Sequence, residues 1–153
     1  MARSSRDSGA GQASTVAALG GSEGVQRRRA SILVGLVSGD LMVGSRLAAL
    51  ARGSGFTLQT VRPGAALTNV DLLLVDLNHD PEGQIALMAG VLAESPRIAA
   101  VCFGPHVQLT QLKPQARAAG AQRCVANSAL LLAVDKAVVA IGQRQAAAPG
   151  GGA

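Results

Sequence analysis

Two hydrophobic patterns alternate along the chain between residues 31 and 141. Short continuous apolar runs, typical of strands buried on both faces of a parallel sheet, are followed by segments whose apolar residues recur every three or four positions, as on one side of a helix. The predicted strands are residues 31–37, 56–61, 70–76, 98–103 and 122–126. This alternation predicts an α/β domain in which helices flank a five-stranded parallel sheet.

Capping residues mark where the helices begin. Asp40 and Asp80 stand at expected N-cap positions, and Pro81 suits the first turn of a helix. The four predicted helices run from Asp40 to about Gly53, from Pro81 through Leu92, from Leu109 or Leu112 to Ala119 with Pro114 near its start or kinking it, and from an Asn127-Ser128 cap to about Ile141. Together with the strands, these helices make a compact βα succession.

The connection between the second and third strands is short. After Arg62-Pro63-Gly64 ends the second strand, only residues 65–69 remain before the third strand, too few for a full crossover helix. We therefore predict a reduced or missing second helix. Part of one sheet face would then be exposed unless a tail or a partner covers it, and we expect that surface to contribute to association.

Both ends of the chain differ in composition from the middle. Residues 1–29 are rich in Ser, Gly and Ala and predict a flexible basic tail, and residues 144–153 predict a second flexible tail around a domain of residues 30–143. The cluster Arg27-Arg28-Arg29 precedes the first strand, and the apolar run after it is too short and too interrupted for an export signal. The cluster is either a solvated charge run or a weak contact for phosphate-rich surfaces.

The charge of the chain is concentrated in the N-terminal tail. The net charge is +5, yet residues 31–141 carry eight basic against seven acidic side chains, so the folded part is nearly neutral. Tyr and Trp are absent and only Phe56 and Phe103 are aromatic. Without aromatic stacking platforms or a basic face, nucleic-acid binding is not expected.

Cellular location follows from the cysteines and from the absence of a long apolar segment. Cys102 and Cys124 lie inside apolar segments, where free thiols behave as small hydrophobes in a reducing compartment. A disulfide between them is not expected, because one ends its strand and the other begins its own. No apolar run approaches the roughly eighteen residues of a membrane helix. A cytoplasmic protein without a membrane segment is the prediction.

The last predicted helix carries apolar residues on two sides. Its broad face of Leu130, Leu131, Val134, Val138 and Ile141 would cover the sheet. On the opposite side, Leu132 and Val139 lie between Asp135 and Lys136. These four residues are either scattered surface positions or an interface, most simply that of a two-fold homodimer.

The order of elements resembles the response-regulator receiver domain, which has a flavodoxin-like fold with strand order 2-1-3-4-5. The resemblance spans residues 31–141 and is clearest in Val70-Asp71-Leu72-Leu73-Leu74-Val75-Asp76, where Asp76 takes the place of the phosphoaccepting aspartate. Residues 118–121, Ala-Ala-Gly-Ala, are also typical of the family. The resemblance implies a three-layer α/β sandwich with its chemistry at the carboxyl edge of the sheet.

Several parts of the phosphorylation site that the resemblance implies are missing. Receivers hold Mg²⁺ with two acids after the first strand, but this chain has Ser38-Gly39 there, and Asp40 follows as a helix cap. Gly104 stands at the position of the hydroxyl residue, or Phe103 or Cys102 if the register shifts, and none of the three carries a hydroxyl. Where the lysine belongs, this chain has Asn127 and Ser128. Without these groups a transferring phosphoryl group would be poorly stabilised.

We therefore expect a non-catalytic, receiver-like signalling domain that works by protein contact or dimerisation, with no cofactor and no metal. Alternatives are a phosphoacceptor that uses Asp76 with help from Asp40, or a small-ligand site at the sheet edge formed by Ser38, Asp76 and His106. His106 could also be a solvated loop residue, and Asp76 a loop or capping carboxylate. The run Asn78-His79-Asp80 fits no compact metal-ligand spacing.

Overall fold

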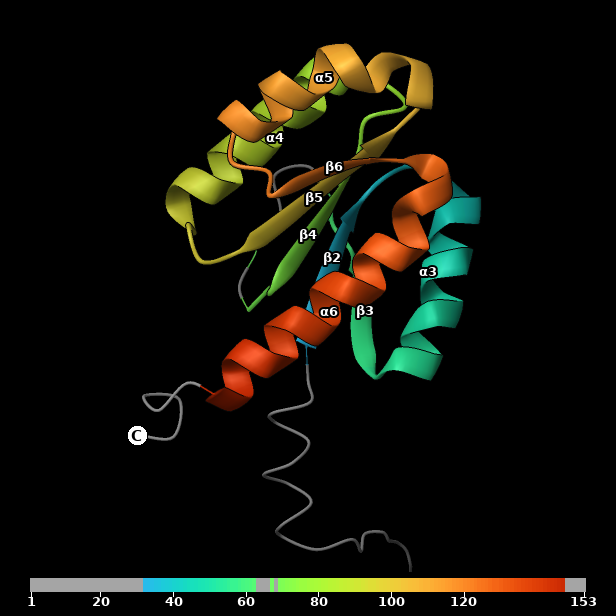
Figure 1. Cartoon of the computed structure of the whole chain (residues 1–153), viewed down its shortest axis with the longest axis vertical. Helices are drawn as coiled ribbons and strands as arrows, with labels where there is room; N and C mark the ends of the chain where they lie inside the picture. The colour runs from blue at the N-terminus through green and yellow to red at the C-terminus, as the bar shows by residue number, and fades with distance from the viewer. Residues whose placement is uncertain (1–31, 63–66, 68, 148–153) are drawn as a thin grey trace, which may run out of the picture. The chain divides into compact units, whose positions relative to one another are not determined.

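The computed structural model describes residues 32–62, 67 and 69–147 (Figure 1). By its internal contacts the chain divides into residues 1–30 and residues 31–153. The first unit lies outside the described residues, and so does the predicted basic tail. In the part of the chain that the structure describes, no helix is long and apolar enough to cross a membrane.

Five parallel strands form one sheet. They are β2 (Ile32–Val37), β3 (Phe56–Thr60), β4 (Leu72–Asp76), β5 (Ala99–Gly104) and β6 (Arg123–Ala126), and they lie in the order β3-β2-β4-β5-β6. Every pair of neighbours is parallel. This is the predicted 2-1-3-4-5 order of the flavodoxin-like fold, which the structure confirms.

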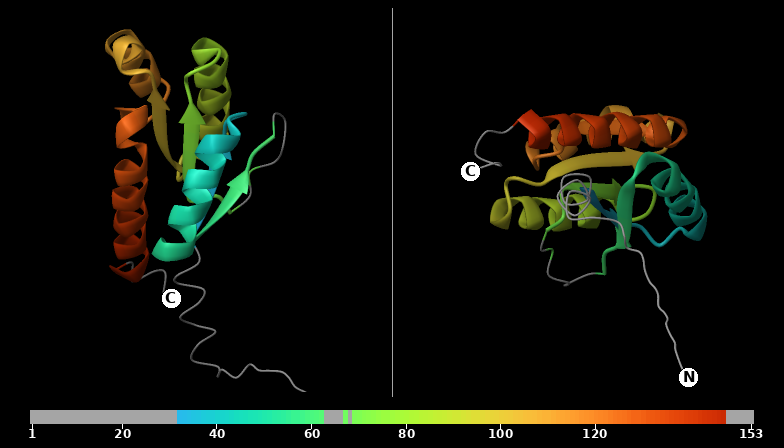
Figure 2. Two further views of the ribbon diagram at one scale, coloured as in Figure 1. Left: turned by 90° about the vertical axis from the view of Figure 1, so that its right-hand side faces the viewer. Right: turned by 90° about the horizontal axis from the view of Figure 1, so that it is seen from below.

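Within the described residues, four α-helices cover the two faces of the sheet. They are α3 (Leu41–Ser54), α4 (Pro81–Glu94), α5 (His106–Ala118) and α6 (Leu130–Ala147), the last entered through a 3₁₀ turn η2 (Asn127–Ala129). Helices α3 and α6 share one apolar core with the sheet, and α4 and α5 share the other. Figure 2 shows the resulting layers, with α6 and α4 on opposite sides of the strands. The predicted caps at Asp40 and Asp80 are present, since their side chains accept backbone N–H groups of α3 and α4. The predicted Asn127-Ser128 cap is wrong, because these residues form η2, which has no side-chain cap hydrogen bond, and Asn127 bonds to Asn78 instead.

The central strand β4 sets the position of the site. All five of its residues are buried, as expected for a strand covered on both faces. Its register against β5 pairs Asp76 with Phe103, so the aspartate ends the strand at the carboxyl edge of the sheet. The continuous apolar run in the sequence therefore places one carboxylate at the edge where this fold class binds ligands.

Described residues of the short connection after β3 pack against the sheet face that a second helix would occupy. Among its described residues, Val61 and Val70 are buried, and a Cβ added to Gly35 would lie 3.0 Å from Cγ2 of Val61. The glycine thus lets the connection lie directly on β2. On the neighbouring strand, the two residues that face this side are exposed and polar, Thr57 and Gln59. Part of this face is therefore exposed on β3, as predicted, and its exposed side chains there are polar. A contribution of this face to association stays a prediction.

Two helices are longer than predicted. Helix α5 begins at His106, about one turn earlier than expected, and contains Pro114 within it. Helix α6 continues to Ala147, so the predicted C-terminal tail begins too early. The last turns of α6 are held because Gly142 lies against Ile32, and the side-chain amide of Gln145 donates to Asp71 Oδ1 over 3.4 Å. The sequence pattern missed these turns because their contacts are made by small and polar residues.

The buried side of α6 is rotated relative to the prediction. Leu131 was expected in the buried stripe but is exposed, whereas Ala133 is buried.

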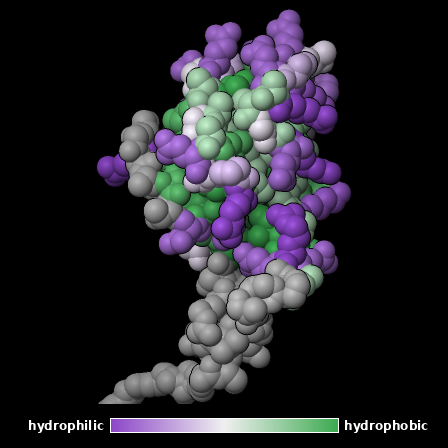
Figure 3. Space-filling model, turned by 90° about the vertical axis from the view of Figure 1, so that its left-hand side faces the viewer, coloured by the Kyte–Doolittle hydropathy of each residue, from purple (hydrophilic) through white to green (hydrophobic). Residues whose placement is uncertain are grey.

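The side of the molecule on which α4 and α5 end shows exposed apolar groups among hydrophilic ones (Figure 3). Leu92, Pro96 and Ile98 line a shallow hollow there.

The two cysteines lie closer together than predicted. Cys102 and Cys124 are register partners on β5 and β6, so the expected offset between them is wrong. Both thiols are free and buried, and Cys102 Sγ lies 3.5 Å from Met88 Sδ. Burial raises the pKa of Cys102 to about 12, with a smaller contribution from Cys124. Burial also raises the pKa of Cys124, which nearby Lys113 and Arg117 partly offset.

Candidate functional site

Asp76 is the one charged side chain that is buried among the described residues, with 3% of its surface exposed. A buried carboxylate is stable only when its oxygens accept hydrogen bonds. The structure supplies them from the two loops that flank the end of β4. The Ser38 hydroxyl donates to Asp76 Oδ2 over 2.6 Å. The backbone N–H and the side-chain amide of Asn78 both donate to Oδ1, over 2.8 and 2.6 Å.

Asn127 closes this network from the far side of β5. Its amide exchanges two hydrogen bonds with the amide of Asn78, of 3.0 and 2.8 Å. The pair joins the loop after β4 to the η2 turn, 49 residues further along the chain. Every donor to the carboxylate is neutral, so Asp76 is hydrogen-bonded without an ion pair in the described network. We call Ser38, Asp76, Asn78 and Asn127 the edge network.

Asp40 lies near the edge network but serves the helix. Its Oδ1 accepts the backbone N–H groups of Met42 and Val43, over 2.8 and 3.4 Å. Its own backbone N–H donates to Ser38 Oγ over 3.0 Å, which fixes the hydroxyl that reaches Asp76. The prediction that Asp40 caps α3 is confirmed. Its carboxylate is exposed and bonds to the helix terminus, so it does not share a described contact with the carboxylate of Asp76.

Two other predicted edge residues contribute less. Gly104 ends β5, where an added Cβ would lie 3.3 Å from Leu77 Cβ, so a larger residue there requires Leu77 to shift. His106 is the exposed first residue of α5, and its side chain has no hydrogen bond among the described residues. It is therefore a helical residue and not a loop residue. The predicted grouping of Ser38, Asp76 and His106 is brought together only for the first two.

A hollow of about 270 Å³ adjoins the edge network between the starts of α3 and α6. Asp40, Asn78, Asn127 and Arg46 line its polar part, and its apolar part includes Phe103. Arg46 is the cationic residue of this lining. Within the described ranges, no group of three or more His, Cys, Asp or Glu side chains could hold a metal ion.

The predicted interface residues on α6 differ in their surroundings. Leu132 and Val139 are 60% and 51% exposed, and Lys136 is exposed between them. Asp135 instead accepts a hydrogen bond of 3.3 Å from the Ser54 hydroxyl, at the end of α3. The acidic member of the predicted surface thus links two helices of the same domain.

Sequence reasoning missed the main partner of Asp76. Asn78 was considered only as a metal ligand, although a carboxylate two residues before an N–H is the spacing of an Asx-turn. That local signal could have identified it.

The net charge of the domain also concealed an uneven distribution of charge, since no acidic residue lies between Glu94 and Asp135. Arg97, Lys113, Arg117 and Arg123 are the basic residues of that stretch.

Comparisons with known proteins agree with this architecture. No family model matches the chain, and no curated protein matches it. Among solved structures, a response regulator from Thermotoga maritima has a TM-score of 0.62 at 16% identity, covering 74% of this chain and 98% of its own. A response regulator receiver domain protein from Clostridium thermocellum has a TM-score of 0.62 at 11% identity, covering 74% and 96%. A CheY-like protein from Pseudomonas aeruginosa has a TM-score of 0.62 at 16% identity, covering 72% and 98%.

These similarities define the class of fold. The chain has the fold of a response-regulator receiver domain, as its sequence resemblance implied. Identities of this size establish the fold and leave the activity to be argued from the site.

Proposed function

We propose that this receiver-fold domain acts in signalling through protein contact and without phosphorylation of Asp76. One observation carries the proposal, namely that both carboxylate oxygens of Asp76 already accept hydrogen bonds from Ser38 and Asn78. A carboxylate that attacks phosphorus needs a free oxygen facing the phosphodonor. Oδ1 accepts two hydrogen bonds and Oδ2 accepts one, and only 3% of Asp76 is exposed, so the remaining lone pair of Oδ2 has little access to a phosphodonor.

The charge of a phosphoryl group also argues against phosphorylation of Asp76. Phosphorylation would replace the single negative charge of the Asp76 carboxylate with a phosphoryl group that carries about −1.5 to −2 units of charge. In a phosphoryl-transfer site, divalent ions and an ammonium or guanidinium group stabilise that charge. The edge network offers a hydroxyl and two amides in their place. A domain without this chemistry retains its surfaces, so we infer that partner recognition is its use, and we assign it to the cytoplasm.

The experiment is incubation of the full chain with Mg²⁺ and acetyl phosphate, followed by intact-protein mass spectrometry. We expect no gain of about 80 Da, the mass of a phosphoryl group. A gain that is lost in the Asp76→Asn variant would refute the proposal and favour the phosphoacceptor alternative. A gain that persists in Asp76→Asn would report modification elsewhere and would be assigned by peptide mapping.

A restored site provides the matched positive control. We would change Ser38→Asp and Asn127→Lys together, which returns one acid and the ammonium group to the edge while Asp76 stays in place. Adding Gly104→Ser supplies the hydroxyl, for which Leu77 must yield by a few tenths of an ångström. If the substituted chain gains the phosphoryl mass and the natural chain does not, the missing groups explain the inactivity.

We also propose that α6 contributes a self-association surface. Leu132 and Val139 are exposed on one side of the helix and lie two turns apart. Light scattering of the full chain at several concentrations tests this. We expect concentration-dependent dimers that the double variant Leu132→Lys/Val139→Lys abolishes, whereas Gln111→Lys, which adds a charge to an exposed position of α5 away from this face, leaves them intact. A strict monomer would refute the surface.

One observation favours a second candidate function, a small-ligand site. The hollow of about 270 Å³ beside the edge network combines Arg46 with two amides and an apolar wall. If this hollow binds a nucleotide or a flavin, that ligand will raise the melting temperature of the natural chain more than that of Arg46→Gln. Equal shifts in the two chains would exclude a role for this hollow.

A further inference from the structure

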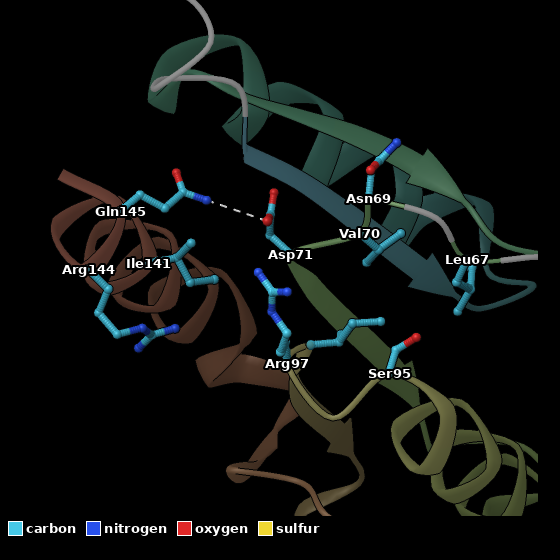
Figure 4. A pocket seen from close by; sticks show the side chains of 10 residues that line it. Leu67, Asn69, Val70, Asp71, Ser95, Arg97, Ile141, Arg144 and Gln145 are labelled. Carbon is cyan, nitrogen blue, oxygen red and sulfur yellow. Dashed lines mark hydrogen bonds between the residues drawn. The ribbon is translucent and has the colours of Figure 1, made fainter. Parts of the chain in front are cut away.

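The amino end of the sheet carries a further hollow, of about 540 Å³ (Figure 4). It opens where β4 and β5 begin and where α6 ends, at the opposite end of the strands from Asp76. Its described lining is Leu67, Asn69, Val70, Asp71, Ser95, Arg97, Ile98, Ile141, Arg144 and Gln145. This volume is within the usual range of small-molecule pockets, about 300–1,000 Å³.

Two guanidinium groups give the hollow its charge. Arg97 comes from the turn before β5, and Arg144 comes from the last turns of α6. Figure 4 shows their side chains on either side of Ile141. Both are exposed, and neither has an ion pair within the described residues. Paired guanidinium groups are suited to a carboxylate or phosphate, because each presents N–H donors in a planar fork.

The acidic residue of the lining is already engaged. Asp71 Oδ2 accepts the backbone N–H of Leu33 over 2.9 Å, and Oδ1 accepts the Gln145 amide over 3.4 Å. These bonds tie the end of α6 to the start of the sheet, which holds the wall of the hollow in place. With two cations against one carboxylate, the described lining is net positive.

Beneath the charged rim the lining is apolar. Val70, Ile98 and Ile141 are buried, and Leu67 is half-buried beside them. Inorganic ions gain nothing from such a surface, whereas an organic anion with a short aliphatic part buries apolar area there.

We propose that this hollow binds a small organic monoanion, with its anionic group between Arg97 and Arg144 and its apolar part against Ile98 and Ile141. The proposal concerns the amino end of the sheet and does not rest on the function proposed for the domain. The second cation distinguishes this site from an ordinary arginine near a helix C-terminus, which Arg144 alone would be. Asp71 disfavours a dianion, since a second negative group would lie near its carboxylate.

The test is titration of the full chain by NMR chemical-shift mapping with three probes of different charge and polarity. The probes are hexanoate, hexylamine and inorganic phosphate. We expect saturable one-site binding of hexanoate, with shifts around Asp71, Ile98 and Gln145. Binding of hexylamine should be undetectable, and phosphate should bind at least about tenfold more weakly than hexanoate, because it cannot use the apolar wall.

Arginine variants separate the site from general charge. Arg97→Gln and Arg144→Gln should each weaken hexanoate binding about tenfold, the effect of one charged hydrogen-bonding pair. Arg123→Gln removes the same charge from an exposed position outside the hollow and should change affinity less than twofold. Equal weakening in Arg123→Gln, equal binding of hexylamine or phosphate, or no saturation by hexanoate would each overturn the proposal.

Discussion

The two ends of the sheet differ in the burial and bonding of their charged side chains. At the carboxyl end, one buried carboxylate, Asp76, accepts hydrogen bonds only from neutral groups, and the network closes on itself. At the amino end, Arg97 and Arg144 are exposed around an open hollow. In a receiver fold the carboxyl end is where chemistry is expected. In this chain Asp76 is surrounded at that end by amide and hydroxyl groups, whereas the hollow at the amino end is lined by two guanidinium groups.

The largest expected effect comes from emptying the carboxyl end. Asp76→Ala leaves the Ser38 hydroxyl and two donors of Asn78 without their acceptor in a largely buried site, which we expect to lower the free energy of unfolding by about 3 kcal/mol. Asp76→Asn should cost less than about 1 kcal/mol, because its carbonyl can accept from Asn78 and its amide can donate to Ser38. Urea denaturation measures both values.

The difference in the free energy of unfolding between the Asp76→Ala and Asp76→Asn variants shows whether Asp76 is a structural acceptor. If Asp76 is a structural acceptor, the asparagine variant retains the network and stays close to the natural chain. An asparagine variant that is clearly more stable than the natural chain would instead indicate a carboxylate held at a cost in stability, as functional charges often are. That outcome would contradict the closed-network interpretation.

Between the two ends of the sheet, the buried Cys102 in β5 should lower the free energy of unfolding at alkaline pH. A cysteine in the unfolded chain loses its proton near pH 9, whereas the raised pKa of Cys102 keeps the folded thiol protonated to about 12. Between these values the unfolded chain binds fewer protons, so increasing pH favours unfolding. We expect the free energy of unfolding to fall by up to about 1.4 kcal/mol per pH unit from pH 9 to 12.

Cys102→Ala provides the check on that slope. The variant should begin less stable because it leaves a small cavity, but its free energy of unfolding should fall less steeply with pH. Denaturation at several alkaline pH values gives both slopes. Parallel curves for the two chains would show that groups elsewhere govern the alkaline response.

A smaller effect is expected at the outer part of the edge network. Asn127→Ala removes the two hydrogen bonds to Asn78, but Asn127 is exposed and water can replace them. We expect a loss of about 0.5–1 kcal/mol in the free energy of unfolding. Ser128→Ala is the matched control, since this exposed neighbour makes no described side-chain hydrogen bond, and it should change stability by less. A loss as large as that of Asp76→Ala would mean that Asn127 supports more than the amide pair.

The fold could be predicted from the sequence because the pattern of apolar residues shows which strands and helices are buried. The run from Leu72 to Asp76 could only be a strand covered on both faces, and the caps at Asp40 and Asp80 fixed where two helices begin. The prediction failed where polar or small residues make the contacts. Gln145 extends α6 by bonding to Asp71, and apolar periodicity contains no trace of that bond.

The position of the candidate site could be predicted from the sequence, but the hydrogen-bond network around Asp76 could not. A strand that ends in Asp76 places a carboxylate at the sheet edge, and the missing acids and lysine could be read directly from the sequence. What replaced them depended on three-dimensional proximity, because Asn78 and Asn127 are 49 residues apart. The arginines at the amino end were invisible for a related reason. A charge total over the whole domain does not show which side chains converge.

The smallest expected effect, at the amino end, completes the comparison. If Arg97 and Arg144 serve a ligand, their removal should cost little stability without one. We expect Arg97→Gln to change the free energy of unfolding by less than about 0.5 kcal/mol, since the side chain is exposed and has no ion pair among the described residues. Arg144→Gln should cost a few tenths of a kcal/mol more, because a cation in the last turns of α6 interacts favourably with the helix terminus. Urea denaturation without added anions measures both, and a loss above about 2 kcal/mol in either variant would make that arginine a structural residue, like Asp76 at the other end.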